Sequence, residues 1–182
     1  MNLDEVTQWK PFTPAGGTPE DLSFLDAHKV TYRHEAAGKP TITYDFWVTY
    51  SFHCFAKDYI HLTDAERSIL MYNGPKDSRP FCYVRYNLAK QYLREIIENL
   101  GSPGVVVRHA GYESYATSKI LTEDGKELWY FVPFKVYREF KKFRIHVTSA
   151  YPVNSNSGGG KVGFFTIAHC LKSGKKLPTP HK

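Results

Sequence analysis

Residues 128–151 read LWYFVPFKVYREFKKFRIHVTSAY. The two ends of this stretch, Leu128 to Arg138 and Phe143 to Tyr151, follow the two-residue period of β-strands, in which successive side chains point to opposite faces. The residues between them, Arg138 to Lys142, predict a tight turn. The stretch therefore predicts two antiparallel strands that belong to the core of the protein.

Further candidate strands flank this pair along the chain. Val105 to Val107 and Tyr112 to Leu121 precede it, and Glu123-Asp124-Gly125-Lys126 is a strong signal for a hairpin turn. Val162 to Leu171 is the candidate strand that follows. We expect strands joined in order by short turns to form an antiparallel meander.

One main helix precedes the meander. Its apolar residues recur at the spacing of an α-helix. They are Ala89, Tyr92, Leu93, Ile96, Ile97 and Leu100. Asn87 can cap the start of this helix, and Gly101 followed by Pro103 stops it. A helix packed on an antiparallel sheet gives the fold class α+β.

The N-terminal half adds a β-hairpin. Val30 to Arg33 and the long run Ile42 to Phe55 flank the turn Ala37-Gly38-Lys39-Pro40. Alternation in the second strand predicts one face in the core and one in solvent. The solvated face carries Thr43, Asp45, Trp47, Thr49, Ser51 and His53. A capping box, Thr63 to Glu66, opens a short helix after the hairpin.

The chain divides into three parts. Residues 1–27 contain Pro and Gly without periodicity and predict an irregular arm. Residues 28–171 predict a single α+β domain, in which the meander sheet packs against one main helix and the N-terminal hairpin forms an extension. Residues 172–182 predict a basic tail without a packing pattern.

The charge of the chain favours a polyanionic partner. Its 182 residues include 24 Lys and Arg against 18 Asp and Glu, which gives a formal charge of +6 and a pI near 9.1. Aromatic residues make up 15% of the chain, and their rings either pack in a sheet or stack on bases. We expect RNA or another nucleic acid as a partner.

The sequence also predicts a compartment. The three cysteines, Cys54, Cys82 and Cys170, form no C-x-x-C pair, so they favour neither a disulfide framework nor a zinc ribbon. The start of the chain, Met1 to Val6, has acidic residues where a signal peptide would be basic. No apolar run approaches the roughly 18 residues that span a bilayer. We expect a cytoplasmic protein that does not associate with membranes.

The strongest chemical signal lies on the strand Phe143 to Tyr151. Alternation places Arg144, His146 and Thr148 on one face of this strand. Cleavage of RNA by its own 2′-hydroxyl needs a base, an acid and a group that stabilises the charged phosphorane, and these side chains can supply them without a metal. His53, on the solvated face of the earlier strand, would complete an acid and base pair with His146. Alternatively, any half-exposed strand alternates polar residues, and His53 is an isolated edge residue.

Basic residues precede this strand. Lys135, Arg138, Lys141 and Lys142 alternate with aromatic residues and predict a positive rim that holds phosphates. Lys161, after three glycines, is a weaker candidate for a phosphate contact. Lysines also accumulate at hairpin tips to protect sheet edges, which is the alternative reading of the rim.

Metal and cofactor sites are not predicted. No His-x-x-His, His-x-x-x-His or close carboxylate cluster provides metal ligands. No glycine loop of the Walker or Rossmann type is present, because Gly158 to Lys161 lacks the spacing. Cys54 and His53 are adjacent on a strand and point to opposite faces, so they form no thiol dyad.

The stretch Lys142 to Tyr151 resembles the strand motif of barnase/EndoU/colicin/RelE-like (BECR) ribonucleases, in which a basic residue, a Thr or Ser and a Tyr close a strand of a sheet behind a helix. The helix and meander from about residue 87 to 171 also resemble that fold. The resemblance implies that Arg144 contacts phosphate, that Thr148 or Ser149 hydrogen-bonds it, and that Tyr151 stacks or donates a proton.

Three functions are compatible with these patterns. The first is a metal-independent endoribonuclease of toxin or phage-conflict type, cleaving RNA by 2′-hydroxyl attack, with a protein partner that neutralises it by covering the basic surface. The second is a non-catalytic module that binds nucleic acid or regulates through it. The third is an adaptor that binds another protein through exposed aromatic residues, and its binding should depend little on salt.

Overall fold

The computed structural model describes residues 6–59, 61–74, 77–111, 114–123, 126–155 and 159–179. The strands are β1 (His28–His34), β2 (Ile42–Tyr50), β3 (Met71–Asn73), β4 (Ser78–Pro80), β5 (Val107–Gly111), β6 (Ser114–Glu123), β7 (Lys126–Glu139), β8 (Lys142–Val147), β9 (Tyr151–Val153) and β10 (Lys161–Val162). The helices are α1 (Asp64–Leu70), α2 (Tyr83–Leu88), α3 (Arg94–Glu98) and α4 (Phe164–Lys172), with 3-10 turns η1 (Ser23–Leu25) and η2 (Phe52–Cys54) and a π-helical segment η3 (Ala89–Leu93).

One large sheet organises the described chain. Its strand order is β1-β2-β8-β7-β6-β5-β10, and β9 pairs with β7 beyond the end of β8. The run β5, β6, β7 and β8 is the antiparallel meander that the sequence predicts. Asp124 and Gly125 of the predicted hairpin turn lie outside the described residues, but Glu123 and Lys126 on either side of them pair.

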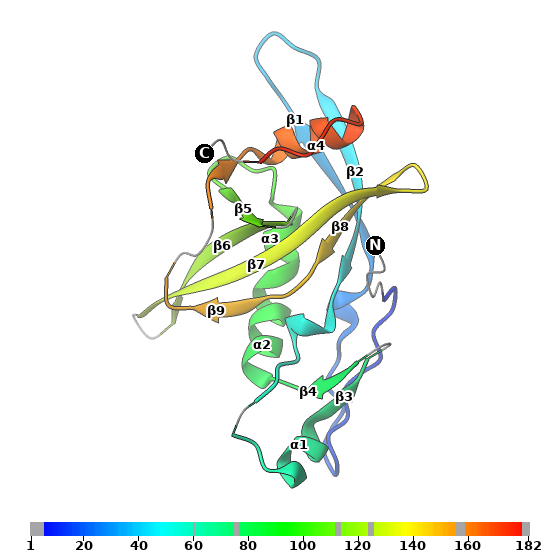
Figure 1. Ribbon diagram of the computed structural model, residues 1–182, viewed down its shortest axis with the longest axis vertical. Coiled ribbons are helices and arrows are strands. Elements are labelled where there is room, and N and C mark those ends of the chain that lie inside the picture. Colours follow the sequence, from blue (N-terminus) through cyan, green and yellow to red (C-terminus); the bar gives the residue numbers. More distant parts are fainter. Residues whose placement is uncertain are drawn as a thin grey trace.

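The N-terminal hairpin is part of this sheet. β2 pairs with β8 in parallel, from Phe46 opposite Phe143 to Tyr50 opposite Val147. The expectation that the hairpin is an extension is therefore refined, because β2 lies beside the meander in the same layer (Figure 1). Two segments about a hundred residues apart in the sequence thus share one surface.

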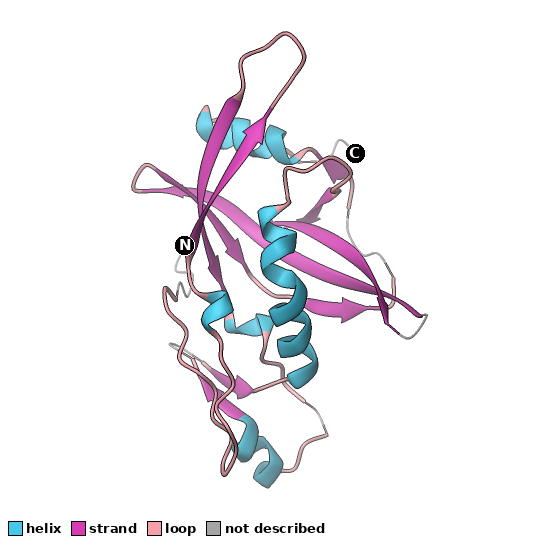
Figure 2. Cartoon of the chain, turned by 180° about the vertical axis from the view of Figure 1, so that it is seen from behind, coloured by secondary structure: helices cyan, strands magenta, loops and turns pink. Residues whose placement is uncertain are grey.

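One continuous helix covers the core face of the sheet. α2, η3 and α3 follow one another without a break, and this helix lies behind β7 in Figure 1 and in front of the sheet in Figure 2. The Tyr32 hydroxyl of β1 donates to the Ile97 carbonyl of this helix at 2.6 Å. Tyr32 also contacts Phe164 of α4, with ring centroids 4.5 Å apart. Both helices therefore pack on the same side of β1.

Alternation of the strands fills the core as expected. Along the central parts of β2, β7 and β8 every second residue is buried, as period two requires of a strand with one covered face. These residues are Tyr44, Phe46, Val48, Tyr50, Tyr130, Val132, Phe134, Val136, Ile145 and Val147.

Three predicted element boundaries are wrong. Val162 to Leu171 is not a strand, because after β10 the chain forms α4, whose buried residues Phe164, Ile167, Ala168 and Leu171 have helical spacing. The main helix begins at Tyr83, so Asn87 lies inside it and is no cap. The third error concerns the two strands that carry the candidate site.

Both strands of the candidate site end earlier than predicted. β2 stops at Tyr50, and the Ser51 hydroxyl accepts from the His53 amide at 3.3 Å, which starts the turn η2. β8 stops at Val147, and the chain resumes pairing only at β9. His53 is therefore in a 3-10 turn and not on the strand. The prediction of a solvated face is also wrong for Thr49 and Ser51, which are buried.

The arm and the tail both pack on the domain. In the arm, Trp9, Phe12, Leu22 and Leu25 are buried, although it holds little regular structure. In the tail, the Pro178 carbonyl accepts from the Tyr115 hydroxyl at 2.9 Å. The tail thus has a packing contact that its composition did not reveal.

No helix in the described ranges is long and apolar enough to cross a membrane.

Candidate functional site

Arg144 and His146 lie on the sheet face that the two helices leave open. The core residues Ile145 and Val147 alternate with them on β8 and are fully buried on the opposite side. Across the sheet, His146 is opposite Lys135 of β7 and Thr49 of β2. This part of the prediction is confirmed, since the two polar side chains share a face.

The imidazole of His146 is buried in that face. Its Nδ1 lies 2.9 Å from the Thr49 hydroxyl, and only 3% of the residue is exposed. A general base must come within hydrogen-bond reach of the proton it removes. An RNA strand lying on this face cannot bring a 2′-hydroxyl to an imidazole that is covered in this way.

Arg144 is held by its own hairpin. The Nη2 atom of Arg144 lies 3.3 Å from a carboxylate oxygen of Glu139, and 15% of the Arg144 side chain is exposed. Its Nε and the neighbouring Tyr137 hydroxyl are buried without a hydrogen-bond partner among the described residues. The guanidinium therefore has one unused donor, but its charge is balanced locally.

Thr148 and Ser149 lie in the break between β8 and β9, and Tyr151 begins β9. The Thr148 amide and hydroxyl both donate to the Pro133 carbonyl, at 3.0 and 3.1 Å. The Ser149 hydroxyl donates to the His53 carbonyl at 3.3 Å. The Tyr151 ring lies 5.1 Å from the Arg85 guanidinium. Thr148 and Ser149 therefore hold backbone carbonyls, whereas the Tyr151 ring contacts a side chain.

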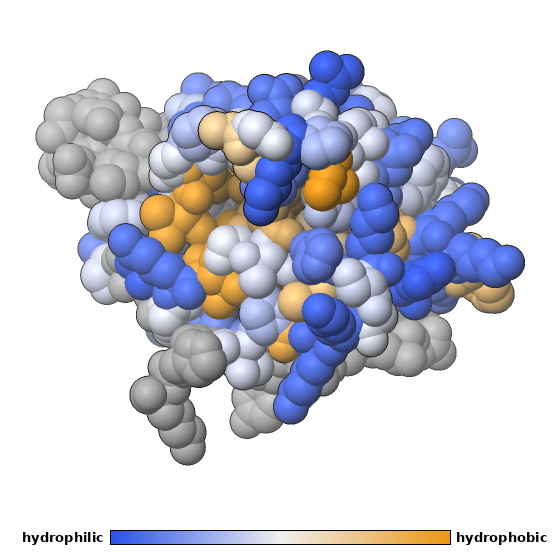
Figure 3. Space-filling view, turned by 90° about the horizontal axis from the view of Figure 1, so that it is seen from above, coloured by the Kyte–Doolittle hydropathy of each residue, from blue (hydrophilic) through white to orange (hydrophobic). Residues whose placement is uncertain are grey.

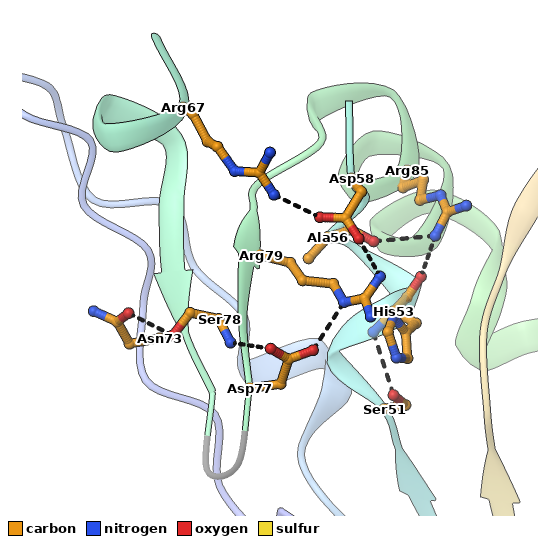
Figure 4. Close-up of polar contacts among 10 residues, drawn as sticks. All are labelled: Ser51, His53, Ala56, Asp58, Arg67, Asn73, Asp77, Ser78, Arg79 and Arg85. Atoms are coloured by element: carbon orange, nitrogen blue, oxygen red, sulfur yellow. Dashed lines mark hydrogen bonds and ion pairs between the residues drawn. The ribbon is translucent and has the colours of Figure 1, made fainter. Parts of the chain in front are cut away.

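His53 joins a second polar cluster, drawn in Figure 4. Arg85 donates from Nη1 to the carbonyls of His53 and Ala56, at 2.8 and 3.0 Å. The pKa of His53 lies below its ordinary value because the ring is partly buried and because Arg79 and Arg85 are close. The imidazole is therefore neutral near pH 7, beside two permanent cations.

Carboxylates balance the other arginines of this cluster. Asp58 accepts from Arg67 at 3.0 Å and from Arg79 at 2.6 Å, and Asp77 accepts from Arg79 at 3.0 Å (Figure 4). These pairs tie α1 and the β3–β4 hairpin to the segment after η2. The structure thus brings His53, Ser149 and Tyr151 together around Arg85, and places His146 on the strand face.

A cavity of about 590 Å³ lies where β2 extends beyond β8. We call it the lysine cavity. Its lining includes Lys29 from β1, Lys141 from the β7–β8 turn, Lys142 from the start of β8, and Lys172 from the end of α4. Trp47, Phe46, Phe143, Thr43 and Asp45 complete it. Figure 3 views the end of the molecule that carries α4, where hydrophilic side chains project around apolar surface.

The lysine cavity keeps a positive charge. Lys29 pairs with Asp45 at 2.9 Å, with both side chains more than half exposed, which screens that pair. Lys172 lies over the Tyr44 ring at 5.4 Å. Lys141, Lys142 and Lys172 have no carboxylate partner among the described residues, so this cavity can attract an anion.

The turn beside the cavity has an unusual conformation. Phe140 and Lys141 both have positive φ angles, 46° and 63°. Two-residue hairpin turns of this kind favour Asn-Gly, because side chains other than Asn and Asp are strained there. Phe140 is also 86% exposed. The chain thus holds an aromatic ring in solvent at a strained position, beside two lysines.

The remaining predicted phosphate contacts lie elsewhere. Arg138 lies over the Phe143 ring at 6.0 Å, near the lysine cavity. Lys135 is on the open face, between Ser114 and His146. Lys161 is in β10, opposite Arg108, at the other end of the sheet. The predicted phosphate contacts therefore lie in three separate places.

The sequence did not predict that three further residues would lie together with Lys141 and Lys142 in the lysine cavity. Lys29, Trp47 and Lys172 come from β1, β2 and α4, and only the folded sheet brings them to the β7–β8 turn. The signal in the sequence was partial, since Trp47 stood on the predicted solvated face and Lys172 in the basic tail.

The described residues hold no group of three or more His, Cys, Asp or Glu side chains that would suit a metal ion. Burial raises the pKa of the Cys54 thiol to about 12, which makes it a poor nucleophile.

Comparison with known proteins gives a family. A model described as the YjaZ family matches residues 11–172. Protein YjaZ of Escherichia coli strain K12 is 50% identical over 178 residues, which cover 98% of each chain. No solved structure matches. Neither finding bears on the resemblance to BECR ribonucleases, which stays a prediction.

Proposed function

The chain belongs to the YjaZ family, and from the geometry of its basic end we propose that it binds single-stranded nucleic acid, RNA in the first place, in the lysine cavity. The observation that carries this proposal is the combination of four lysines with Trp47 and Phe143 in one cavity. Exposed Phe140 stands beside that cavity. A cytoplasmic location, where such a partner is present, belongs to the same proposal.

The two kinds of side chain match the two parts of a nucleotide. Lysines neutralise phosphates and release counterions, which supplies affinity for any sequence. Aromatic rings stack on bases, and each such contact contributes roughly 1–3 kcal/mol. Trp47 and Phe140 can supply stacking on either side of the phosphate-binding lysines. A single strand fits this pattern better than a duplex, because its bases are accessible.

Binding has more support than cleavage. His146 is bonded to Thr49 and buried, Thr148 is bonded to Pro133, and Arg144 is paired with Glu139. A ribonuclease would need these groups at the phosphodiester. Endoribonuclease activity, with a neutralising protein partner, is therefore the alternative that the same assay must exclude or establish.

Titration with a labelled single-stranded RNA of about 12 nucleotides tests the proposal, because this length lies within the range of about 4–16 nucleotides that known single-strand sites occupy. We expect fluorescence anisotropy to show an association constant whose logarithm falls linearly with the logarithm of the salt concentration. The expected slope is about −3, because each of the four lysine contacts contributes about −0.7. Incubation in EDTA should leave the RNA intact. Absence of a salt dependence would favour a protein-binding adaptor, and 2′,3′-cyclic phosphate ends would establish cleavage.

The strained turn permits a separate prediction. Phe140→Asn with Lys141→Gly should raise the free energy of unfolding by about 1–3 kcal/mol, since Asn-Gly relieves the positive-φ strain. The same variant should bind RNA about tenfold more weakly, because it loses one lysine and one stacking ring. Urea unfolding and anisotropy measure the two effects.

Lys141→Gly alone is the control for the turn. This variant should show part of the increase in the free energy of unfolding, and it should keep the stacking of Phe140 on a base. If the double variant gains stability and binds RNA as well as the parent chain, the strained aromatic tip has no part in binding.

A further inference from the structure

A second cavity lies at the opposite end of the sheet. It has a volume of about 480 Å³, within the range of small-molecule sites. Its walls come from α3, the connection before β5, and strands β5, β6, β7 and β10. We call it the α3 cavity. It shares no residue with the lysine cavity.

Two cations face each other at one side of the α3 cavity. Arg108 of β5 and Lys161 of β10 are direct partners in an antiparallel pair, and both line the cavity. Like charges directly opposite each other destabilise a sheet. Neither side chain has a carboxylate partner among the described residues, and the one hydrogen bond of Arg108 goes to the Gly159 carbonyl at 3.2 Å. An anion between them would remove this repulsion.

The rest of the wall is apolar or internally satisfied. Ile96, Val105, Val106 and Trp129 line the cavity, and Val105 and Val106 are 36% and 39% exposed. These adjacent exposed valines give the cavity an apolar surface on which an apolar ligand group can pack.

Lys119, Thr117 and Asn99, which also line the α3 cavity, already have partners. Lys119 pairs with Glu95 at 3.1 Å. The Thr117 hydroxyl donates to the Val106 carbonyl at 3.1 Å. The Asn99 amide donates to the Glu95 carbonyl at 2.9 Å. This leaves Arg108 and Lys161 as the cations available to a ligand.

We infer that the α3 cavity binds a small organic anion, with one carboxylate or phosphate head between Arg108 and Lys161 and an aromatic or branched apolar body on Val105, Val106 and Trp129. A pair of charged donors fixes the head, since charge-assisted hydrogen bonds are about twice as strong as neutral ones. The apolar wall takes the body. This site is independent of nucleic-acid binding at the other end of the sheet.

The chain provides separate optical reporters for the two cavities. It has three tryptophans, of which Trp129 lines the α3 cavity, Trp47 lines the lysine cavity and Trp9 is buried in the core. In a Trp47→Phe background, Trp129 is the remaining tryptophan that lines either cavity, so its emission should respond to a ligand in the α3 cavity.

Calorimetric titration with 4-phenylbutyrate, against the neutral 4-phenyl-1-butanol, tests the inference. We expect the carboxylate to bind and to change Trp129 emission in the Trp47→Phe background, and the alcohol to bind at least about tenfold more weakly. Arg108→Gln with Lys161→Gln should weaken carboxylate binding about tenfold or more and leave RNA binding unchanged. Urea unfolding confirms that this variant folds.

Lys141→Gln with Lys142→Gln is the matched control, since it removes the same charge from the other cavity. It should weaken RNA binding and leave 4-phenylbutyrate binding unchanged. Equal binding of acid and alcohol, or equal loss in both double variants, would overturn the inference. Failure of RNA binding with retained carboxylate binding would overturn only the proposed function.

Discussion

Replacing Lys141 and Lys142 with glutamate is expected to weaken the binding of single-stranded RNA by about 100-fold at physiological salt, because two phosphate contacts become two repulsions. Lys141 in the β7–β8 turn and Lys142 at the start of β8 both line the lysine cavity, and neither has a carboxylate partner among the described residues. The variant reverses most of the charge that the cavity presents, since Lys29 is already paired with Asp45. Anisotropy titrations between about 50 and 200 mM salt measure the loss.

The salt dependence of RNA binding shows whether the two lysines contact phosphates directly. Lys141→Ala with Lys142→Ala should make the slope shallower by about 1.4, which is 0.7 for each lost contact to a single strand. Lys10→Glu with Lys57→Glu makes the same change in net charge as Lys141→Glu with Lys142→Glu, but at exposed positions outside the cavity. If this control weakens RNA binding as much as the turn variant, the interaction follows the overall charge and has no defined site.

Local patterns predicted most of the sheet. The meander from β5 to β8 follows from alternation and from turn signals that lie within a few residues of the strands they join. The parallel contact between Phe46 and Phe143 joins residues far apart in the sequence, and no local signal specifies it. The segment after Val162 was misread because a short apolar run fits a strand and a buried helix equally well.

The candidate site shows the same division. Alternation correctly placed Arg144 and His146 on one face. It could not show that Thr49 bonds His146 or that neighbouring strands bury it, because those neighbours are set by non-local pairing. For the same reason the sequence predicted only part of the lysine cavity. The β7–β8 turn follows from a local pattern, whereas Lys29 and Lys172 reach the cavity only through non-local packing.

Arg85→Ala is expected to lower the free energy of unfolding by about 2–4 kcal/mol. Arg85 donates from its Nη1 atom to two carbonyls, of His53 in η2 and of Ala56 just after it. Because both hydrogen bonds share this atom and are only partly buried, we count them together at about 1.5–3 kcal/mol, the range for hydrogen bonds to charged groups. The contact of its guanidinium with the Tyr151 ring adds a further share, about 0.5–1 kcal/mol for a partly exposed pair. Urea unfolding followed by circular dichroism measures the change.

Two further arginine variants test whether the loss of stability is specific to the guanidinium of Arg85. Arg85→Lys keeps the charge but offers a single ammonium in place of a planar fork, so we expect it to restore less than half of the loss. Arg94→Ala removes an exposed pair with Glu98 on the same helix and should cost no more than about 0.5 kcal/mol. A loss below about 1 kcal/mol for Arg85→Ala would show that the η2 segment does not depend on this side chain.

The RNA affinity of folded Arg85→Ala then decides the role of the His53 cluster. If Arg85 only holds the backbone, the variant should bind RNA as the parent chain does at temperatures where both are folded, because the lysine cavity lies on other strands. If RNA affinity falls while the fold persists, nucleic acid contacts the surface around His53, Ser149 and Tyr151. The proposed position of RNA would then move from the β7–β8 turn to the break between β8 and β9.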